Sequence, residues 1–157
     1  MLHHEKFIRE VVQMAQENVG TGIGGPFAAL VVKNGEIVGR GVNRVTSTND
    51  PTAHAEVVAI RDACKNLNHY QLTDCILYAS CEPCPMCLGA IYWARPQMIV
   101  FAAENTDAAK AGFDDSFIYK EVSLPYQQRA ITTLNIKPDN FFSPFSTWLE
   151  NETRKLY

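Results

Sequence analysis

The first third of the chain predicts one helix followed by a β-hairpin. A broad apolar stripe at helical spacing runs through Phe7, Val11, Met14 and Asn18, with Ile8, Val12, Ala15 and Val19 beside them. The glycine-rich stretch 20–25 ends this predicted helix. Two apolar segments, 27–32 and 37–43, then flank Asn34-Gly35, a dipeptide that is typical of a tight hairpin turn.

The middle of the chain alternates between helical and strand-like patterns. A polar segment, 44–52, leads into a second predicted helix whose apolar positions are Val57, Ile60, Cys64 and Leu67. Residues 76–80 form a short β-rich run, residues 84–93 are helical in pattern, and residues 98–103 predict another apolar strand. Because strands and helices alternate here, we expect crossover connections and parallel strand pairing.

The pattern weakens after residue 103. Asp114-Asp115-Ser116 can cap a short helix, and residues 131–136 predict a fifth strand. A final helix is indicated by Phe145, Trp148, Leu149 and Glu152. A chain of 157 residues has the usual size of one domain. We therefore expect a single domain over residues 1–157, with an α/β fold of three α/β/α layers around a mixed five-stranded central sheet.

Charge and composition favour a small-molecule substrate. The formal net charge is -3, and the 14 Lys and Arg residues are scattered instead of forming a basic run, which argues against a nucleic-acid partner. The N-terminus lacks the basic start and long apolar run of a signal peptide, and no later segment approaches membrane-spanning length. We expect a cytoplasmic protein with no membrane partner.

Histidine and cysteine residues predict a metal site. Three of the five cysteines lie three residues apart, at Cys81, Cys84 and Cys87, which suits metal binding better than disulfides. His54 and the pair Cys84 and Cys87 stand at two predicted helix starts, so one nitrogen and two sulfurs can hold a tetrahedral zinc ion with an open position. Zinc is preferred over iron. The alternative is a closed structural zinc site that also uses Cys81, although Cys81 ends a strand outside the helix.

Glu56 gives this predicted zinc site a chemical task. Zinc lowers the pKa of a bound water to about 7. Glu56, two residues after His54, can then carry protons from that water to a substrate ring nitrogen and to a leaving amine. An H-x-E motif together with P-C-x-x-C is the signature of zinc-dependent deaminases. The competing hypothesis is a non-catalytic binding module stabilised by zinc, in which Glu56 has no such task.

Three longer segments resemble a known family. Through His54-Ala-Glu56 and Pro83-Cys84-Pro-Met-Cys87 the sequence is similar to the cytidine deaminase superfamily. Within it, Thr48–Glu56, Ser80–Arg95 and Asn105–Glu121 closely resemble bacterial guanine deaminases, and the likeness covers nearly the whole chain. The resemblance implies a cytidine deaminase-like fold, one Zn²⁺ per chain, and hydrolysis of guanine to xanthine and ammonia in purine metabolism. Guanosine, cytosine, an aminated triazine and tRNA adenosine are the alternative substrates.

The resemblance also implies roles for residues to which the local pattern alone assigns packing, capping or turns. Asp115 would be a second catalytic carboxylate that contacts the guanine edge, with Asp114 as the alternative, and Glu82 would support the metal loop. The remaining implied substrate contacts are Phe27 and Trp93 as pocket walls, and Asn43 and the backbone of Ala55 as hydrogen-bonding groups.

A homodimer is implied by the C-terminal segment. In the family this segment, here about residues 140–157, is exchanged between two subunits, so that a terminal tyrosine closes the active site of the partner. Tyr157 matches that tyrosine. The resemblance therefore implies a homodimer with exchanged C-terminal segments and Tyr157 as a substrate contact.

Overall fold

A layered α/β structure occupies the larger part of the chain. The computed structural model describes residues 2–157, with side chains from residue 4 onward, and they divide into two compact units that meet at Asp115 and Ser116. The elements of the first unit are α1 (Leu2–Thr21), β1 (Ala28–Lys33), β2 (Glu36–Val42), α2 (Val45–Thr48), α3 (Ala55–Leu67), β3 (Cys75–Cys81), α4 (Pro85–Ala94), β4 (Met98–Ala103) and α5 (Asn105–Lys110). Those of the second unit are α6 (Ser116–Ser123), η1 (Tyr126–Gln128) and α7 (Ser143–Glu150).

The sheet of the first unit is mixed and has the strand order β2-β1-β3-β4. β1 pairs antiparallel with both β2 and β3, whereas β3 pairs parallel with β4. The parallel pair is joined by α4, as the alternation of helical and strand patterns predicts. The expected three-layer α/β fold with a mixed central sheet is therefore confirmed.

The expected fifth strand, at residues 131–136, is wrong. The sheet has four strands, and residues 131–136 adopt no regular secondary structure. Ile131, Leu134 and Ile136 are between 77% and 81% exposed. A β-rich sequence becomes a strand only where another backbone offers hydrogen bonds, and the unit that contains this segment consists of helices and irregular chain.

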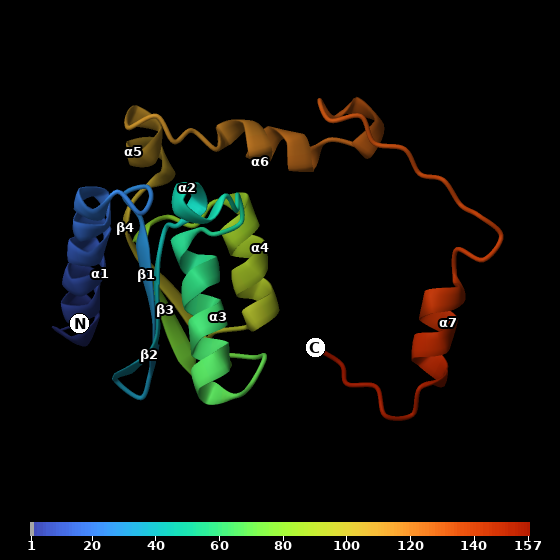
Figure 1. The fold of residues 1–157 in the computed structure, drawn as a ribbon, viewed down its shortest axis with the longest axis horizontal. Helices are drawn as coiled ribbons and strands as arrows, with labels where there is room; N and C mark the ends of the chain where they lie inside the picture. Colours follow the sequence, from blue (N-terminus) through green and yellow to red (C-terminus); the bar gives the residue numbers. More distant parts are fainter. Residues whose placement is uncertain (1) are drawn as a thin grey trace. The chain divides into compact units, whose positions relative to one another are not determined.

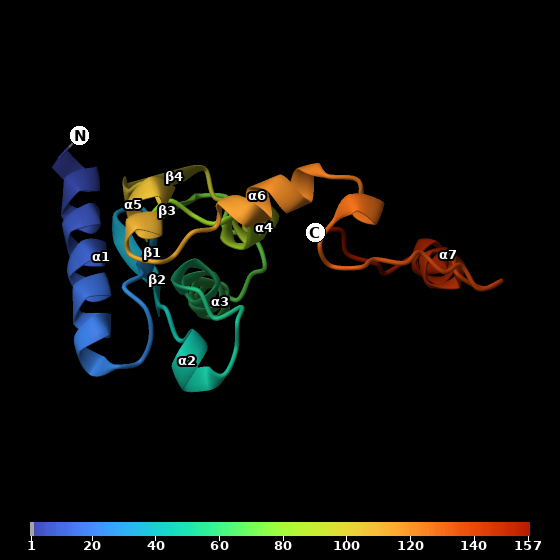
Figure 2. The same cartoon turned by 90° about the horizontal axis from the view of Figure 1, so that it is seen from above.

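Strict alternation along β1 creates the two cores of the first unit. Ala28, Leu30 and Val32 pack in one cluster with Phe7, Val11 and Ala15 of α1, while Ala29 and Val31 join the second cluster with alanines of α3. Figures 1 and 2 show the result, with α1 covering one face of the sheet and α3 and α4 side by side on the other. Both helices of the predicted metal site therefore lie on the same face.

Two glycines of β2 let α3 approach the sheet closely. A Cβ atom at Gly41 would lie 2.1 Å from the carbonyl oxygen of Ala55, and one at Gly39 would lie 2.6 Å from that of Ala59. The helix presents its smallest side chains to this strand, at Ala55, Ala59 and Ala63. This close packing fixes the start of α3, where His54 and Glu56 lie, against the end of β2.

The hairpin turn between β1 and β2 forms as predicted. Asn34 and Gly35 have φ angles of 52° and 81°, so both central residues are in the left-handed region. This is the backbone of a type I′ turn, which matches the twist of the two strands that it joins.

The second unit is helical and has no core of its own. Neither α6 nor α7 contains a buried residue, although both carry large apolar side chains. In the part of the chain that the structure describes, no helix has the length and apolar character needed to cross a membrane.

Candidate metal centre

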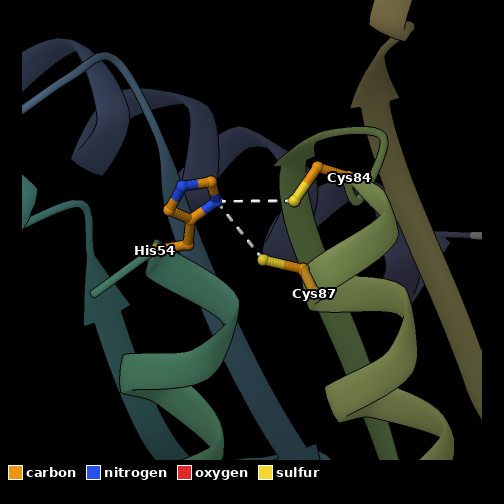
Figure 3. A group of neighbouring side chains, drawn as sticks. All are labelled: His54, Cys84 and Cys87. Atoms are coloured by element: carbon orange, nitrogen blue, oxygen red, sulfur yellow. Dashed lines mark hydrogen bonds between the residues drawn. The ribbon is translucent and has the colours of Figure 1, made fainter. Parts of the chain in front are cut away.

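His54 and Cys84 occupy equivalent positions at the starts of two neighbouring helices. His54 is the N-cap residue of α3 and Cys84 that of α4, both with the extended backbone that an N-cap residue adopts. Neither side chain makes a capping hydrogen bond to its own helix. Figure 3 shows that both side chains turn instead toward the space between the helices, where Cys87 joins them from the first turn of α4.

The three ligand atoms have the separations that a tetrahedral zinc ion requires. His54 Nδ1 lies 3.5 Å from Cys84 Sγ and 3.5 Å from Cys87 Sγ, and all three atoms lie within 4.8 Å of one another. Zinc bonds of about 2.05 Å to nitrogen and about 2.3 Å to sulfur at tetrahedral angles place these atoms about 3.6 Å apart. The predicted ligands are thus brought together at separations that fit zinc, and three protein ligands leave one position of a tetrahedral ion to another ligand.

The surroundings of the two thiols favour a bound cation. The hydrogen bond from Cys87, followed by that from His54, lowers the pKa of Cys84 to about 4. The pKa of Cys87 is raised, first by its interaction with the sulfur of Cys84 and second because it is buried. One thiolate therefore forms readily, and the second forms when a cation neutralises the pair.

Cys81 is a packed thiol outside this group. Its Sγ lies 3.6 Å from the carbonyl oxygen of Glu104, and its side chain is buried at the end of β3. Burial raises the pKa of Cys81 to about 11. A thiol with this environment resists the deprotonation that metal binding requires, which disfavours the closed site with Cys81 as a fourth ligand.

Glu56 is a buried carboxyl beside the ligands. It is the second residue of α3, is 8% exposed, and accepts a hydrogen bond from Cys87 Sγ at 3.4 Å. Burial is the main cause that raises its pKa. A thiolate at Cys87 has no proton to donate, so the metal-bound state leaves Glu56 Oε2 available to another donor.

Asn43 lies where β2 ends, beside the loop that precedes His54. The next residue, Arg44, donates its backbone N–H to the carbonyl oxygen of Ala53, which is adjacent to His54. Asn43 Oδ1 accepts hydrogen bonds from the backbone N–H groups of Gly25 and Val45, at 3.1 and 3.3 Å. The turn role that the local pattern assigns to this residue is therefore present.

The side-chain amide nitrogen of Asn43, Nδ2, has no hydrogen-bond acceptor among the residues that the structure describes. Every fully buried side-chain nitrogen or oxygen that the structure describes has a hydrogen-bond partner. Asn43 Nδ2 donates to none of the described protein groups, so it is not fully buried. Nδ2 is therefore reachable from outside, and its two N–H groups can serve a ligand.

Phe27 has an aromatic partner that the sequence pattern does not identify. Its ring packs edge-to-face against Phe113, with the ring centroids 4.9 Å apart. Phe113 lies two residues before Asp115. The contact therefore joins the start of β1 to the segment that carries the second predicted carboxylate.

Of the two neighbouring aspartates, Asp115 is the more buried one. It is half-buried, whereas Asp114 is exposed. The pKa of Asp115 is raised by burial and then by the negative charge of Cys84. Glu82 ties the same region together, because its Oε2 accepts a hydrogen bond from the backbone N–H of Asn105 at 3.1 Å. This bond ties the loop before α4 to the start of α5.

The remaining predicted contacts lie in three different places. Ala55 is the first residue of α3, so its backbone N–H emerges from the helix start beside the metal ligands without an acceptor in the helix. Trp93 lies near the C-terminal end of α4, six residues after Cys87 and about 9 Å farther along the helix axis, and is 64% exposed. Tyr157 belongs to the second unit. Roles for Trp93 and Tyr157 in substrate binding stay predictions.

Comparison with known proteins defines the class to which this fold and site belong. The family model of the cytidine and deoxycytidylate deaminase zinc-binding region matches residues 1–103, which include all three candidate metal ligands and Glu56. The chain belongs to this family of zinc-binding deaminases.

Within the family the similarity extends over the whole chain in one relative. The guanine deaminase of Bacillus subtilis (strain 168) is 58% identical over 156 residues, which cover 99% of this chain and 100% of that protein. The X-ray structure of that enzyme superposes with a TM-score of 0.96 over 98% of each chain.

Two more distant relatives match less completely. A structure of guanine deaminase from Nitrosomonas europaea has a TM-score of 0.66 and 28% identity, and covers 90% of this chain and 70% of that one. The tRNA-specific adenosine deaminase of Haemophilus influenzae is 37% identical over 116 residues, which cover 71% of this chain and 67% of that protein. The likeness to the adenosine deaminase is therefore partial.

Proposed function

We propose that this protein hydrolyses guanine to xanthine and ammonia with one zinc ion per chain. The observation that carries the proposal is the His54, Cys84 and Cys87 group with its buried neighbour Glu56, in a chain that is 58% identical over nearly its full length to a guanine deaminase. A site with one nitrogen and two sulfurs leaves a coordination position for water, which a closed structural site does not.

The chemistry divides between the metal and Glu56. When bound, zinc supplies the acidity that brings the pKa of a coordinated water to about 7. Glu56 takes a proton from the attacking water and delivers it to the ring nitrogen next to the amino-bearing carbon. It then helps to protonate the leaving amine, so that a C–O bond forms, the C–N bond breaks and one water is consumed for each ammonia released.

Binding of the base is assigned to groups around this centre. Asn43 Nδ2 and the backbone N–H of Ala55 are hydrogen-bond donors for acceptor atoms of the purine. Phe27 offers an aromatic wall, and Asp115 accepts hydrogen bonds from the N–H groups of the guanine edge or assists proton transfer. Trp93 and Tyr157 complete the pocket in this proposal.

We also propose that the protein is a homodimer in which each chain, residues 1–157, forms one deaminase domain. The C-terminal segment, about residues 140–157, is exchanged between the two subunits. Support comes from the second unit, which contains no buried residue and exposes the apolar side chains Phe145, Trp148, Leu149 and Leu156. A unit without a core gains stability only by burying such side chains against another surface, and a second copy of the chain supplies one.

Free ligand thiols at Cys84 and Cys87 also require a reducing compartment, for which we propose the cytoplasm.

The decisive experiment measures ammonia release and conversion of free guanine to xanthine by purified, untagged protein, with bound zinc counted in the same sample. We expect about one zinc per chain and rapid turnover of guanine. Guanosine, cytosine, an aminated triazine and adenosine in tRNA are assayed in parallel. Zinc binding with no turnover of guanine, or a large preference for one of the other substrates, would overturn the assignment.

The competing binding-module hypothesis makes a different prediction in the same assay. A zinc-stabilised module without catalysis binds one zinc but releases no ammonia from any of these substrates. Turnover that disappears on removal of zinc with a chelator and returns when zinc is restored therefore excludes that hypothesis.

A further inference from the structure

We infer that Asn18, on α1, is a positioning residue for the amide of Asn43 and for the aromatic wall at Phe27. The inference rests on the proposed function, since it concerns the groups that bind the base. Asn18 lies on the helix that covers the opposite face of the sheet from α3 and α4, and it is the buried polar member of the stripe that Phe7 and Val11 begin.

Asn18 is a buried amide that joins two separate segments of backbone. Its side chain is on a residue only 3% exposed. Its Nδ2 donates to the carbonyl oxygen of Gly25 at 2.8 Å and to that of Asn43 at 3.0 Å. Both hydrogens of one amide nitrogen are therefore used to hold the loop before β1 against the end of β2.

Every polar atom of Asn43 except Nδ2 has a hydrogen-bond partner in the protein. Its backbone N–H donates to Phe27 at 3.0 Å, its carbonyl oxygen accepts from Asn18, and its Oδ1 accepts from Gly25 and Val45. The remaining group is Nδ2, which the proposed function assigns to the base. A donor whose neighbours are fixed in this way is aimed without loss of side-chain freedom on binding.

The loop that Asn18 holds also carries the aromatic wall. Gly25 accepts a hydrogen bond from the backbone N–H of Phe27 at 2.9 Å, and a Cβ at Gly25 would lie 3.3 Å from the ring of Phe27 and 3.5 Å from that of Phe113. A Cβ at Gly24 would lie 2.1 Å from the carbonyl oxygen of Asn43. Because the loop packs this closely, Asn18 sets the amide donor and the aromatic rings relative to each other.

Loss of the two bonds from Asn18 should therefore act on substrate binding and not on the metal. The carbonyl oxygens of Gly25 and Asn43 would each lose a buried donor, and the loop would shift to recover hydrogen bonds elsewhere. A displacement of about 1 Å of a group that orients a substrate can lower the rate by about 100-fold. The hydrogen bonds of Asn18 go to Gly25 and Asn43 and not to His54, Cys84 or Cys87, so zinc content should stay unchanged.

The test is a double-mutant cycle between Asn18→Ala and Asn43→Ala in the zinc-loaded protein, read as kcat and KM for guanine. We expect Asn18→Ala to lower kcat/KM by about 10- to 100-fold, mainly through KM, with zinc still near one per chain. In the Asn43→Ala background the same change should lower kcat/KM by a clearly smaller factor, because the amide that Asn18 aims is already missing and only its effect on Phe27 remains. Asn18→Ser, which introduces no charge and can donate at most one hydrogen bond, provides the same comparison if the alanine variant does not fold.

The matched control is Asn66→Ala. Asn66 also uses its Nδ2 to bond a backbone carbonyl across two elements, that of Val38 at 2.9 Å, but it lies at the other end of α3 from His54. We expect this variant to lose some stability and to keep its kinetic constants. Full additivity in the cycle, or an unchanged KM for Asn18→Ala, would show that Asn18 has only a structural role. A wild-type protein that is inactive on guanine would instead overturn the proposed function.

Discussion

His54 and Cys84 stand at N-cap positions without performing the N-cap function. A side chain that accepts a hydrogen bond at this position stabilises its helix by about 1 kcal/mol, and neither residue does so here. Both side chains are instead directed toward a shared point between α3 and α4. The two helix starts therefore depend on bound metal for part of their stabilisation, and loss of a ligand should affect both metal content and stability.

Cysteine substitution separates the ligands from the nearby packed thiol. Cys84→Ser should abolish stoichiometric zinc binding, because serine does not replace a thiolate, and should lower the thermal stability of the protein. The matched variant Cys81→Ser should keep about one zinc per chain, since Cys81 lies outside the ligand group. Metal content by atomic emission and melting temperature are the measurements. Loss of zinc in Cys81→Ser would instead support a closed four-ligand site.

Removal of the carboxyl at Glu56 separates chemistry from metal binding. Glu56→Gln keeps the volume of the buried side chain and should retain zinc and fold. It should lower kcat by about 100- to 10,000-fold, the range of proton-transfer groups. Steady-state kinetics on guanine with zinc quantified in each sample test this. A variant that retains more than a tenth of wild-type kcat would rule out Glu56 as the proton shuttle.

The two adjacent aspartates form a natural pair for a third comparison. Asp115 is half-buried, with a pKa raised by burial and then by the negative charge of Cys84, and Asp114 is exposed. Loss of a hydrogen bond to a charged group costs about 1.5–3 kcal/mol, so Asp115→Asn should lower kcat/KM for guanine by roughly 10- to 100-fold. Asp114→Asn should change it by less than about threefold. The reverse order would assign the substrate contact to Asp114.

At the scale of elements, the site depends on how closely α3 packs against β2. Small residues on both sides bring the helix start within reach of the strand end, and the alanines of α3 face the glycines of β2. The same helix supplies His54 at its cap and Glu56 in its first turn. Packing between these two elements therefore sets the position of a metal ligand and of the proposed proton shuttle together.

Two glycine substitutions test this packing with opposite expected signs. Gly41→Ala would place a Cβ 2.1 Å from a backbone oxygen of α3, and should lower the free energy of unfolding by about 1–3 kcal/mol or more. Gly89→Ala lies within α4, where a Cβ meets nothing within 4 Å, and should be neutral or raise it by up to about 1 kcal/mol. Urea unfolding of the zinc-loaded proteins measures both. Equal stability of Gly41→Ala and wild type would mean that α3 can move away from β2 at little cost.

At the scale of the whole molecule, the two units differ in how they are stabilised. The first unit has two buried clusters on opposite faces of its sheet, whereas the second has apolar side chains but no buried residue. A unit with apolar side chains but no buried residue becomes stable only by packing those side chains against another apolar surface. This difference is the physical basis for the proposed exchange between subunits.

A complementation experiment tests whether Tyr157 acts on the partner subunit. Glu56→Gln and Tyr157→Ala chains, each nearly inactive alone, are refolded together. With exchange in a random mixture, half of the dimers contain one chain of each kind and one intact site, so activity should reach about a quarter of wild type. Light scattering of the wild-type protein should show a dimer. A mixture no more active than its components would show that Tyr157 does not complete the site of another chain.

The metal ligands, Glu56 and the order of the longer helices and strands follow from the sequence alone, whereas the short helices α2 and α5 do not. Each feature that follows from the sequence depends on residues close together in the chain or on a motif with fixed spacing, as in the helical repeat before residue 20, the Asn34-Gly35 turn, and Cys84 with Cys87. Even here the sequence pattern predicts one strand too many, because residues 131–136 have strand-like composition but no strand beside them. Composition reports what a segment can form, while a strand also needs a partner.

Only the tertiary structure decides which distant residues support the site. The amide of Asn18 meets Gly25 and Asn43, and the ring of Phe27 meets that of Phe113, across separations that no periodicity encodes. Hydrophobic patterning indicates that a position is buried but not which group it contacts. The metal centre could therefore be predicted from local spacing, whereas the residues that aim its substrate-binding groups emerge only when the sheet brings both ends of the first unit together.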